Sequence, residues 1–110
     1  MPWAYILKCS DGSYYTGSTL DLARRLCQHE LGEAANYTRT RRPVTLAYAE
    51  EFDRIDDAFA REKQLQGWSR AKKEALMEGR TADLRLLAAR LGYSIDRFER
   101  LSDRGRNTGP

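Results

Sequence analysis

Residues 3–18 read WAYILKCSDGSYYTGS, and this pattern predicts a β-hairpin near the start of the chain. Aromatic and branched side chains dominate residues 3–9 and return at residues 14–18, which favours two strands. Residues 10–13 form a turn sequence in which Gly12 can adopt the positive φ angle that a tight turn needs. We therefore expect two antiparallel strands joined by a short turn.

A helix is predicted directly after the hairpin. Thr19 is a candidate N-cap, and Asp21 would interact favourably with the helix dipole in the first turn. Leu22 and Leu26 fall on one face of this helix, which we expect to pack on the sheet. The helix should stop at Gly32.

The rest of the chain predicts one more strand and three more helices. They are a strand at residues 44–48, a helix from near Asp56 that is interrupted at Gly67, a helix at residues 70–78, and an amphipathic helix from Thr81 to Gly92. The expected class is α+β, with a small three-stranded antiparallel sheet flanked by helices and a helical C-terminal extension. We divide the chain into a main domain (1–80), an extension packed on it (81–101) and a flexible tail (102–110).

The chain has 110 residues and a net charge of +3, and its charges are unevenly spread. Residues 36–42 and 61–73 are strongly basic, whereas residues 50–57 are strongly acidic. This separation favours a basic face that binds a polyanion, although solvated surfaces explain it equally well. The chain has no run of 18 or more apolar residues and no signal-peptide pattern, so we expect a cytoplasmic protein without membrane contact. Cys9 and Cys27 are expected to be buried thiols.

Polar and aromatic side chains around the hairpin form a candidate site. Tyr5 and Tyr15 lie on the paired strands, where both can reach one face of the sheet. Gly17 leaves room for another backbone or a ligand phosphate. Arg25 and His29 are four residues apart and share one side of the predicted helix. Each residue also has a structural alternative, since strand tyrosines and helical histidines are mostly packing residues.

Glu62 is a carboxylate within the predicted apolar stripe of a helix. It lies three residues after Phe59 and three before Leu65. Burying a carboxylate is costly unless it is paired or binds a metal ion. Glu62 therefore either forms a partly buried salt bridge with Arg25 or another arginine, or it holds a cation.

The chain resembles the GIY-YIG nuclease superfamily in the order and spacing of Tyr5, Tyr15, Thr16, Gly17, Arg25, His29 and Glu62. The resemblance covers about residues 3–77, including the segments 37–43 and 68–76, and is to small bacterial stand-alone domains. The N-terminal nuclease domain of the repair protein UvrC is another member. Trp3 and Ala4 replace the Gly-Ile of the first tripeptide that names the family, and Thr16 replaces the Ile of the second, while both tyrosines and the second glycine are kept. Many members carry a late Asn or Gln near the site, and none is assigned here.

The resemblance implies a metal-dependent DNA endonuclease that hydrolyses phosphodiester bonds. One divalent cation, Mg²⁺ or Mn²⁺, would be held by Glu62, since hard cations favour carboxylate oxygen. Tyr5 would act as general base, and Tyr15 would orient the water or support Tyr5. Arg25 would stabilise the charge on the scissile phosphate, and His29 would bind that phosphate or assist proton transfer.

The expected partner is DNA, single-stranded or distorted duplex, in DNA repair or processing. The candidate phosphate-binding residues are Arg39, Arg41, Arg42, Lys63, Arg70, Lys72 and Lys73. Tyr37 and Trp68 could stack on bases, although packing is the favoured interpretation for Trp68. A protein partner could supply specificity. The alternative functions are a catalytically silent nucleic-acid-binding module and a protein-interaction role for the helices of residues 81–101.

Overall fold

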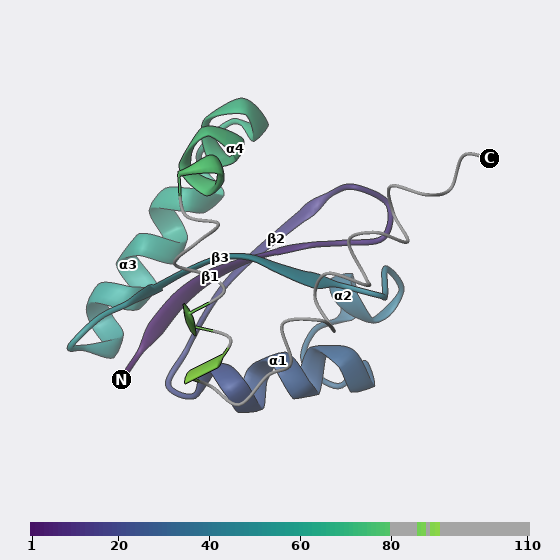
Figure 1. Cartoon of the computed structure of the whole chain (residues 1–110), viewed down its shortest axis with the longest axis horizontal. Coiled ribbons are helices and arrows are strands. Elements are labelled where there is room, and N and C mark those ends of the chain that lie inside the picture. Colours follow the sequence, from purple (N-terminus) through teal and green to yellow (C-terminus); the bar gives the residue numbers. More distant parts are fainter. Residues whose placement is uncertain (80–85, 88, 91–110) are drawn as a thin grey trace.

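The structure is a computed structural model that describes residues 1–79, 86, 87, 89 and 90. The elements, in chain order, are β1 (Trp3–Lys8), β2 (Tyr14–Thr19), α1 (Leu22–Leu31), α2 (Asn36–Arg39), β3 (Thr45–Glu51), α3 (Ile55–Gln66) and α4 (Arg70–Glu78). Figure 1 shows α1 and α2 on one side of the strands and α3 and α4 on the other. The predicted α+β class, with a three-stranded sheet flanked by helices, is confirmed.

The sheet is antiparallel, with the strand order β2-β1-β3. Because β1 is central and both its faces are covered, its residues from Trp3 to Leu7 are all buried. The register pairs Tyr5 with Gly17 and Leu7 with Tyr15. Tyr5 and Tyr15 therefore project from the same face of the sheet, as the sequence predicts.

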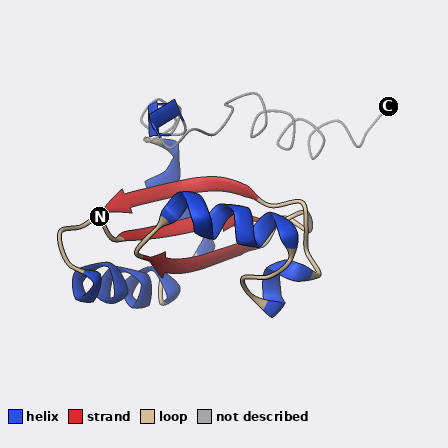
Figure 2. Ribbon diagram, turned by 90° about the horizontal axis from the view of Figure 1, so that it is seen from below, coloured by secondary structure: helices blue, strands red, loops and turns tan. Residues whose placement is uncertain are grey.

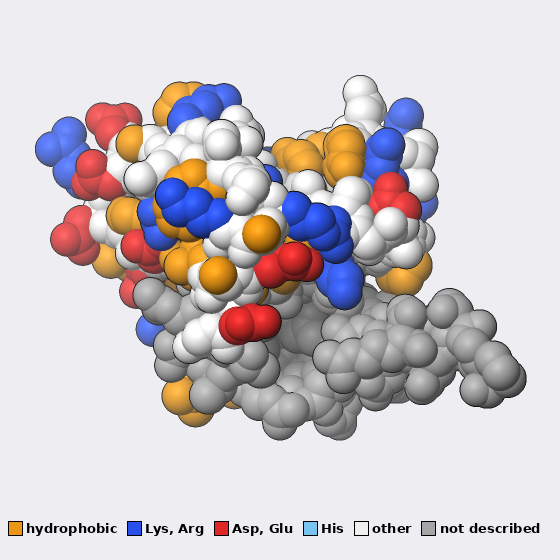
Figure 3. Space-filling model, turned by 90° about the horizontal axis from the view of Figure 1, so that it is seen from above, with side chains coloured by type: hydrophobic (Ala, Val, Ile, Leu, Met, Phe, Trp, Pro, Cys, Tyr) orange, Lys and Arg blue, Asp and Glu red, His pale blue; other side chains and the backbone are white. Residues whose placement is uncertain are grey.

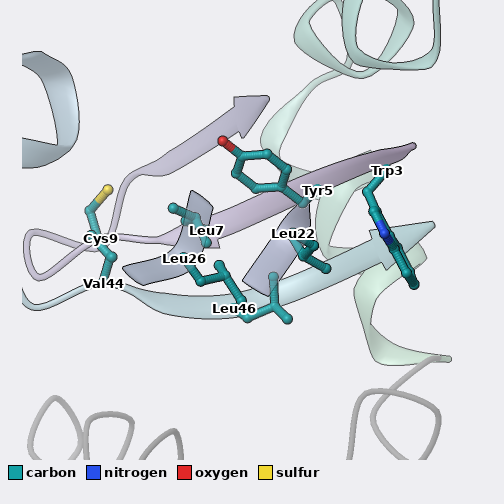
Figure 4. Packing of buried hydrophobic residues seen from close by; sticks show 8 residues of the cluster. All are labelled: Trp3, Tyr5, Leu7, Cys9, Leu22, Leu26, Val44 and Leu46. Atoms are coloured by element: carbon teal, nitrogen blue, oxygen red, sulfur yellow. The ribbon is translucent and has the colours of Figure 1, made fainter. Parts of the chain in front are cut away.

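Two hydrophobic clusters, one on each face of the sheet, hold the helices in place. On the first face, alternate residues of β1 pack against Leu22 and Leu26 of α1 (Figure 4). On the second face, Leu65 of α3 packs with Ile6 and Tyr48 of the sheet, and Leu76 and Met77 of α4 pack against this cluster. Figure 2, seen from below, shows α1 in front of the strands. The side chains of β1 alternate between these two clusters, which places the candidate tyrosines on the α1 side.

The start of α1 differs from the prediction, because Thr19 belongs to β2. Thr19 pairs with Trp3 across the sheet, and its hydroxyl exchanges hydrogen bonds with the backbone of Asp21. The N-cap is Asp21, whose carboxylate accepts a hydrogen bond from the backbone N–H of Arg24. The helix ends at Gly32 as predicted, with a φ angle of 78°.

The apolar stripe predicted for α3 is partly wrong. Ala58 and Leu65 are buried, but Ile55 and Phe59 are 39% and 51% exposed. Ala58 and Leu65 are seven residues apart, which is about two helical turns, so both lie on the buried face of α3. Positions 55 and 59 lie off this face. Phe59 instead packs with Lys63, whose Nζ lies 4.9 Å from the ring centroid.

Cys27 is exposed, which corrects the expectation that both thiols are buried. It follows Leu26 on α1, and one residue along a helix turns the side chain by about 100° away from the sheet. Cys9, at the end of β1, is buried as expected.

The predicted extension and tail lie mostly outside the described residues. Of the helix expected from Thr81 to Gly92, the structure describes residues 86, 87, 89 and 90. Leu87 packs against the cluster on the α1 side, and Arg90 donates a hydrogen bond of 3.2 Å to Glu51. The division into residues 1–80, 81–101 and 102–110 stays a prediction. No helix among the described residues is long and apolar enough to span a membrane.

Thr16 on β2 yields a stability prediction. Its buried hydroxyl oxygen has no hydrogen-bond partner among the described residues. Because an unpaired buried hydroxyl is costly, Thr16→Val should raise the free energy of unfolding by about 1 kcal/mol, measured by urea denaturation. The matched control is Thr19→Val, which removes a bonded hydroxyl from the same strand and should lower the free energy of unfolding. Changes of the same sign in both variants would contradict this account.

Candidate active site

The centre of the site is a chain of three buried polar side chains from three elements. Tyr5 Oη of β1 lies 2.9 Å from His29 Nε2 in the last turns of α1. The other ring nitrogen of His29, Nδ1, lies 2.8 Å from Thr38 Oγ1 of α2. All three residues are 0% exposed. Hydrogen bonding at both ends holds the imidazole ring in one orientation.

The Tyr5 phenol and the His29 imidazole are both neutral at neutral pH in this buried site. Burial raises the pKa of Tyr5, and the charges of Tyr15 and Glu62 raise it further, while Arg25 lowers it. Burial also lowers the pKa of His29 to about 4, and the positive charge of Arg25 contributes. The resting site therefore holds a phenol beside a neutral imidazole.

Tyr15 is enclosed by other aromatic rings. Its ring centroid lies 6.5 Å from that of Tyr5 and 5.3 Å from that of His29, the second in an edge-on arrangement. Tyr37 of α2 stacks on Tyr15 at 6.1 Å, and the guanidinium of Arg41 lies 3.9 Å from the Tyr37 ring centroid. These contacts join the two candidate tyrosines and the histidine into one aromatic cluster.

Gly17 makes room for Tyr5 itself, which corrects the expectation of a neighbouring backbone or ligand phosphate there. A Cβ at position 17 would lie 2.6 Å from Tyr5 Oη and 2.7 Å from Tyr5 Cζ. The phenol therefore lies directly across the glycine backbone. Figure 4 shows its oxygen pointing away from Leu22 and Leu46.

The side chain of Glu62, on α3, lies beside the edge strand β2 and is 12% exposed. Its carboxylate accepts hydrogen bonds from Ser18 Oγ at 2.7 Å and from Gln66 Nε2 at 3.0 Å. Lys63 Nζ lies 3.6 Å from the same carboxylate. One interpretation of the sequence paired Glu62 with Arg25. In the part of the chain that the structure describes, Glu62 forms no salt bridge with Arg25 within 4.0 Å, and Lys63 is its charged neighbour. The positive charge of Arg25 instead lowers the pKa of both Tyr5 and His29.

The donor set around Glu62 fits a hard divalent cation. A carboxylate beside a hydroxyl presents oxygen atoms, the ligands that Mg²⁺ and Mn²⁺ prefer. No group of three His, Cys, Asp or Glu side chains gathers anywhere in the part of the chain that the structure describes. A cation held by Glu62 would therefore need water and substrate oxygen for most of its coordination shell.

Several residues predicted to bind phosphate also make contacts within the protein. Arg41 forms a 3.0 Å ion pair with Asp11 in the β1–β2 turn. Arg42 donates hydrogen bonds to the backbone carbonyls of Arg39 and Glu30, at the ends of α2 and α1. Arg70 donates to the carbonyl of Gly12 at 2.7 Å. Phosphate binding by these arginines stays a prediction, and their internal contacts give them a structural role as well.

The remaining basic candidates lie at the surface. Figure 3 shows Lys and Arg side chains across the middle of one face, with Asp and Glu mostly toward one end. Lys63 and Lys72 pack over Phe59 and Trp68, with Nζ 4.9 and 4.2 Å from the ring centroids. Trp68 is itself packed against the cluster on the α3 side, which agrees with the packing interpretation.

Three residues of the site are not among the sequence predictions. Gln66 is four residues after Glu62 on α3, so helical spacing could have indicated their contact. Ser18 follows the motif glycine and reaches Glu62 only because β2 and α3 pack together. Thr38 contacts His29 across the loop between α1 and α2, and no local pattern reveals it.

The three-stranded sheet with helices on both faces (Figure 1) agrees with the class that the sequence resembles, a catalytic domain of the nuclease type. The model of the GIY-YIG catalytic domain matches residues 1–75, and the chain belongs to this family. This confirms the resemblance drawn from the sequence.

The relatives of the chain carry the name UPF0213 protein. One from Halobacterium salinarum is 50% identical over 76 residues, which cover 69% of this chain and 99% of that protein. Another from Staphylococcus saprophyticus is 45% identical over 75 residues, covering 68% and 92%. The solution NMR structure of a UPF0213 protein from Bacillus halodurans is 42% identical, with a TM-score of 0.47 and coverage of 71% and 84%. The names state no activity, so the family alone implies nuclease chemistry.

Gly17→Ala tests the close packing of Tyr5. The added Cβ would meet Tyr5 Oη at 2.6 Å, so the phenol must move away from His29. We expect a loss of about 1–3 kcal/mol in the free energy of unfolding, measured by urea denaturation. Gly79→Ala is the control, because a Cβ there meets nothing within 4 Å, and it should be close to neutral. An unchanged stability of Gly17→Ala would show that the phenol is not held there.

The buried imidazole predicts a stability loss on mild acidification. The pKa of His29 falls from 6.5 to about 4 on folding, so the unfolded chain binds the extra proton between these values. The contribution of His29 to the free energy of unfolding should be fully present above about pH 6.5. The free energy of unfolding should then fall by up to about 3 kcal/mol as the pH drops to about 4. The measurement is urea unfolding at a series of pH values. In His29→Gln this component should vanish, and an identical pH profile in parent and variant would contradict it.

Proposed function

We propose that this chain is a metal-dependent DNA endonuclease that hydrolyses phosphodiester bonds. The observation that carries the proposal is the 2.9 Å contact between Tyr5 Oη and His29 Nε2 inside a GIY-YIG domain. A phenol whose pKa is raised by burial is a poor base by itself. A neutral imidazole at hydrogen-bond distance can accept the phenol proton as the phenol takes one from water.

The reaction then proceeds by attack of water on phosphorus. The water proton passes to Tyr5 Oη while the Tyr5 proton passes to His29 Nε2. The bond between phosphorus and the 3′ oxygen breaks, and a solvent water protonates that oxygen, which leaves 5′-phosphate and 3′-hydroxyl ends. The proton on His29 then passes to the hydroxide that this water leaves, which restores the neutral imidazole. Tyr15 packs against both Tyr5 and His29 and would keep the phenol aligned with the attacking water.

Arg25 is the proposed ligand of the scissile phosphate. Its planar guanidinium suits two phosphoryl oxygens and the charge that develops on them. In the free protein burial lowers the pKa of His29, and the charge of Arg25 lowers it further. A bound phosphate would offset that charge, so His29 becomes a better proton acceptor when the substrate is in place.

Glu62 is the residue we assign to a single divalent cation, Mg²⁺ or Mn²⁺. Its hydrogen bonds to Ser18 and Gln66 fix the carboxylate and leave further lone pairs for a cation. When bound, the cation supplies Lewis-acid stabilisation of the phosphoryl charge. With one protein carboxylate, we expect weak metal affinity until the substrate phosphate contributes.

The proposed substrate is single-stranded or distorted duplex DNA in a cytoplasmic repair or processing pathway. The net positive charge and the Lys and Arg side chains at the surface support a polyanionic substrate (Figure 3). Contacts to phosphates carry no base sequence, so a protein partner is a plain way to add specificity. We extend the phosphate-binding role to Arg39, Lys63, Lys72 and Lys73, whose side chains lie at or near the surface.

A catalytically silent nucleic-acid-binding module is the second candidate. The observation that favours it is the complete burial of Tyr5, because a general base must reach the attacking water. Under the endonuclease proposal, substrate binding has to open the site on the Tyr5 side. Under the alternative, DNA is bound with no opening and no product.

Removing either assigned group should strongly slow cleavage. Glu62→Ala and Arg25→Ala should each lower the cleavage rate by about 10²-fold or more, because each removes charge stabilisation of the transition state. The assay uses single-stranded, duplex, flapped and four-way DNA with Mg²⁺ or Mn²⁺. Glu78→Ala is the control, since Glu78 is an exposed carboxylate at the end of α4.

Metal dependence separates the two candidate functions. The endonuclease should stop in EDTA, while a binding module would retard DNA with or without metal and yield no product. Unchanged cleavage by Glu62→Ala would rule out the assigned metal site.

A further inference from the structure

We propose that Thr38 is the positioning residue that fixes the tautomer of His29, with Nδ1 protonated and Nε2 left to accept the proton of Tyr5. The catalytic consequence rests on the proposed endonuclease function. The tautomer itself does not, because it follows from the hydrogen bonds of the free protein.

The direction of the Thr38 hydroxyl determines which histidine nitrogen carries the proton. Thr38 Oγ1 donates a hydrogen bond of 3.2 Å to the backbone carbonyl of Ala35. A hydroxyl has one proton, so toward His29 Nδ1, at 2.8 Å, its oxygen acts as the acceptor. Nδ1 therefore carries the N–H.

The other nitrogen then has a free lone pair that faces Tyr5. Burial and the charge of Arg25 hold the pKa of His29 at about 4, so the ring is neutral and has a single N–H. Nε2 accepts from the phenolic O–H of Tyr5 at 2.9 Å. The opposite tautomer would give up the bond from Thr38 to Ala35. It would also turn Nε2–H toward the phenol oxygen that has to take up the water proton.

The short helix α2 holds Thr38 in this place. The backbone N–H of Arg39 donates to the Ala35 carbonyl at 3.0 Å, and that of Arg41 donates to the Thr38 carbonyl at 3.0 Å. Thr38 itself is fully buried, and its neighbour Tyr37 stacks on Tyr15. The segment predicted to follow the DNA backbone thus also orients both the proton acceptor and the second tyrosine.

NMR of the free protein tests the tautomer directly. His29 is the sole histidine of the chain, so its two ring nitrogens can be assigned without ambiguity. At neutral pH we expect Nδ1 at a protonated ¹⁵N shift and Nε2 at an unprotonated one. The reverse pattern, or an even mixture of the two, would overturn the proposal, whether or not the protein cleaves DNA.

Substitutions at Thr38 test its control of His29. Thr38→Val removes the acceptor of the Nδ1 proton, so the Nε2–H tautomer should dominate and the cleavage rate should fall by about 10²-fold. Thr38→Ser keeps the hydroxyl and should restore both the parental ¹⁵N pattern and most of the activity. Thr40→Val is the control on the same segment, because Thr40 is exposed and makes no hydrogen bond to His29 in the described residues.

The combined outcomes separate this proposal from the proposed function. An unchanged ¹⁵N pattern in Thr38→Val would overturn the role of Thr38. If Thr38→Val fails to fold, the parental pattern and that of Thr38→Ser still decide the tautomer. A parent with the expected tautomer and no cleavage of any DNA would overturn the endonuclease function and leave the tautomer assignment intact.

Discussion

A fully buried phenol is the constraint on which the rest of this structure depends. The hydroxyl of Tyr5 would be costly to bury without a hydrogen-bond partner, and its ring needs space against the neighbouring strand. Gly17 provides the space, because the antiparallel register places it directly opposite Tyr5. His29 provides the partner, which requires α1 to cross this face of the sheet at one position. The hairpin register and the placement of α1 are therefore fixed by the same side chain.

The parts of the site that follow from local periodicity can be predicted from the sequence. Alternation along the hairpin places Tyr5 and Tyr15 on one face, and the four-residue spacing places Arg25 and His29 on one side of α1. Their roles in catalysis come only from the family resemblance. The three strands and most helix boundaries also follow from patterns of apolar side chains and turn residues.

Features that depend on packing between distant segments escape such patterns. Phe59 has the helical spacing of a core residue, but α3 is rotated so that Ala58 and Leu65 face the sheet instead. Thr38 lies in the segment 37–43 that the resemblance includes, but no local pattern shows its contact with His29, because that contact forms only when α2 folds against α1. Thr19 looks like an N-cap by residue type, yet strand pairing extends through it.

The β1–β2 turn acts as a junction between the two helical layers. The segment after α2 reaches it through Arg41, which pairs with Asp11, and through the Arg41 carbonyl, which accepts from Ser10. From the other layer, Arg70 at the start of α4 donates to the carbonyl of Gly12. A surface hairpin loop is ordinarily a convenient place to insert a tag or a sensor domain. Here an insertion would break the contacts to the segment after α2 and to α4 at once, so fusions to this protein belong elsewhere on the chain.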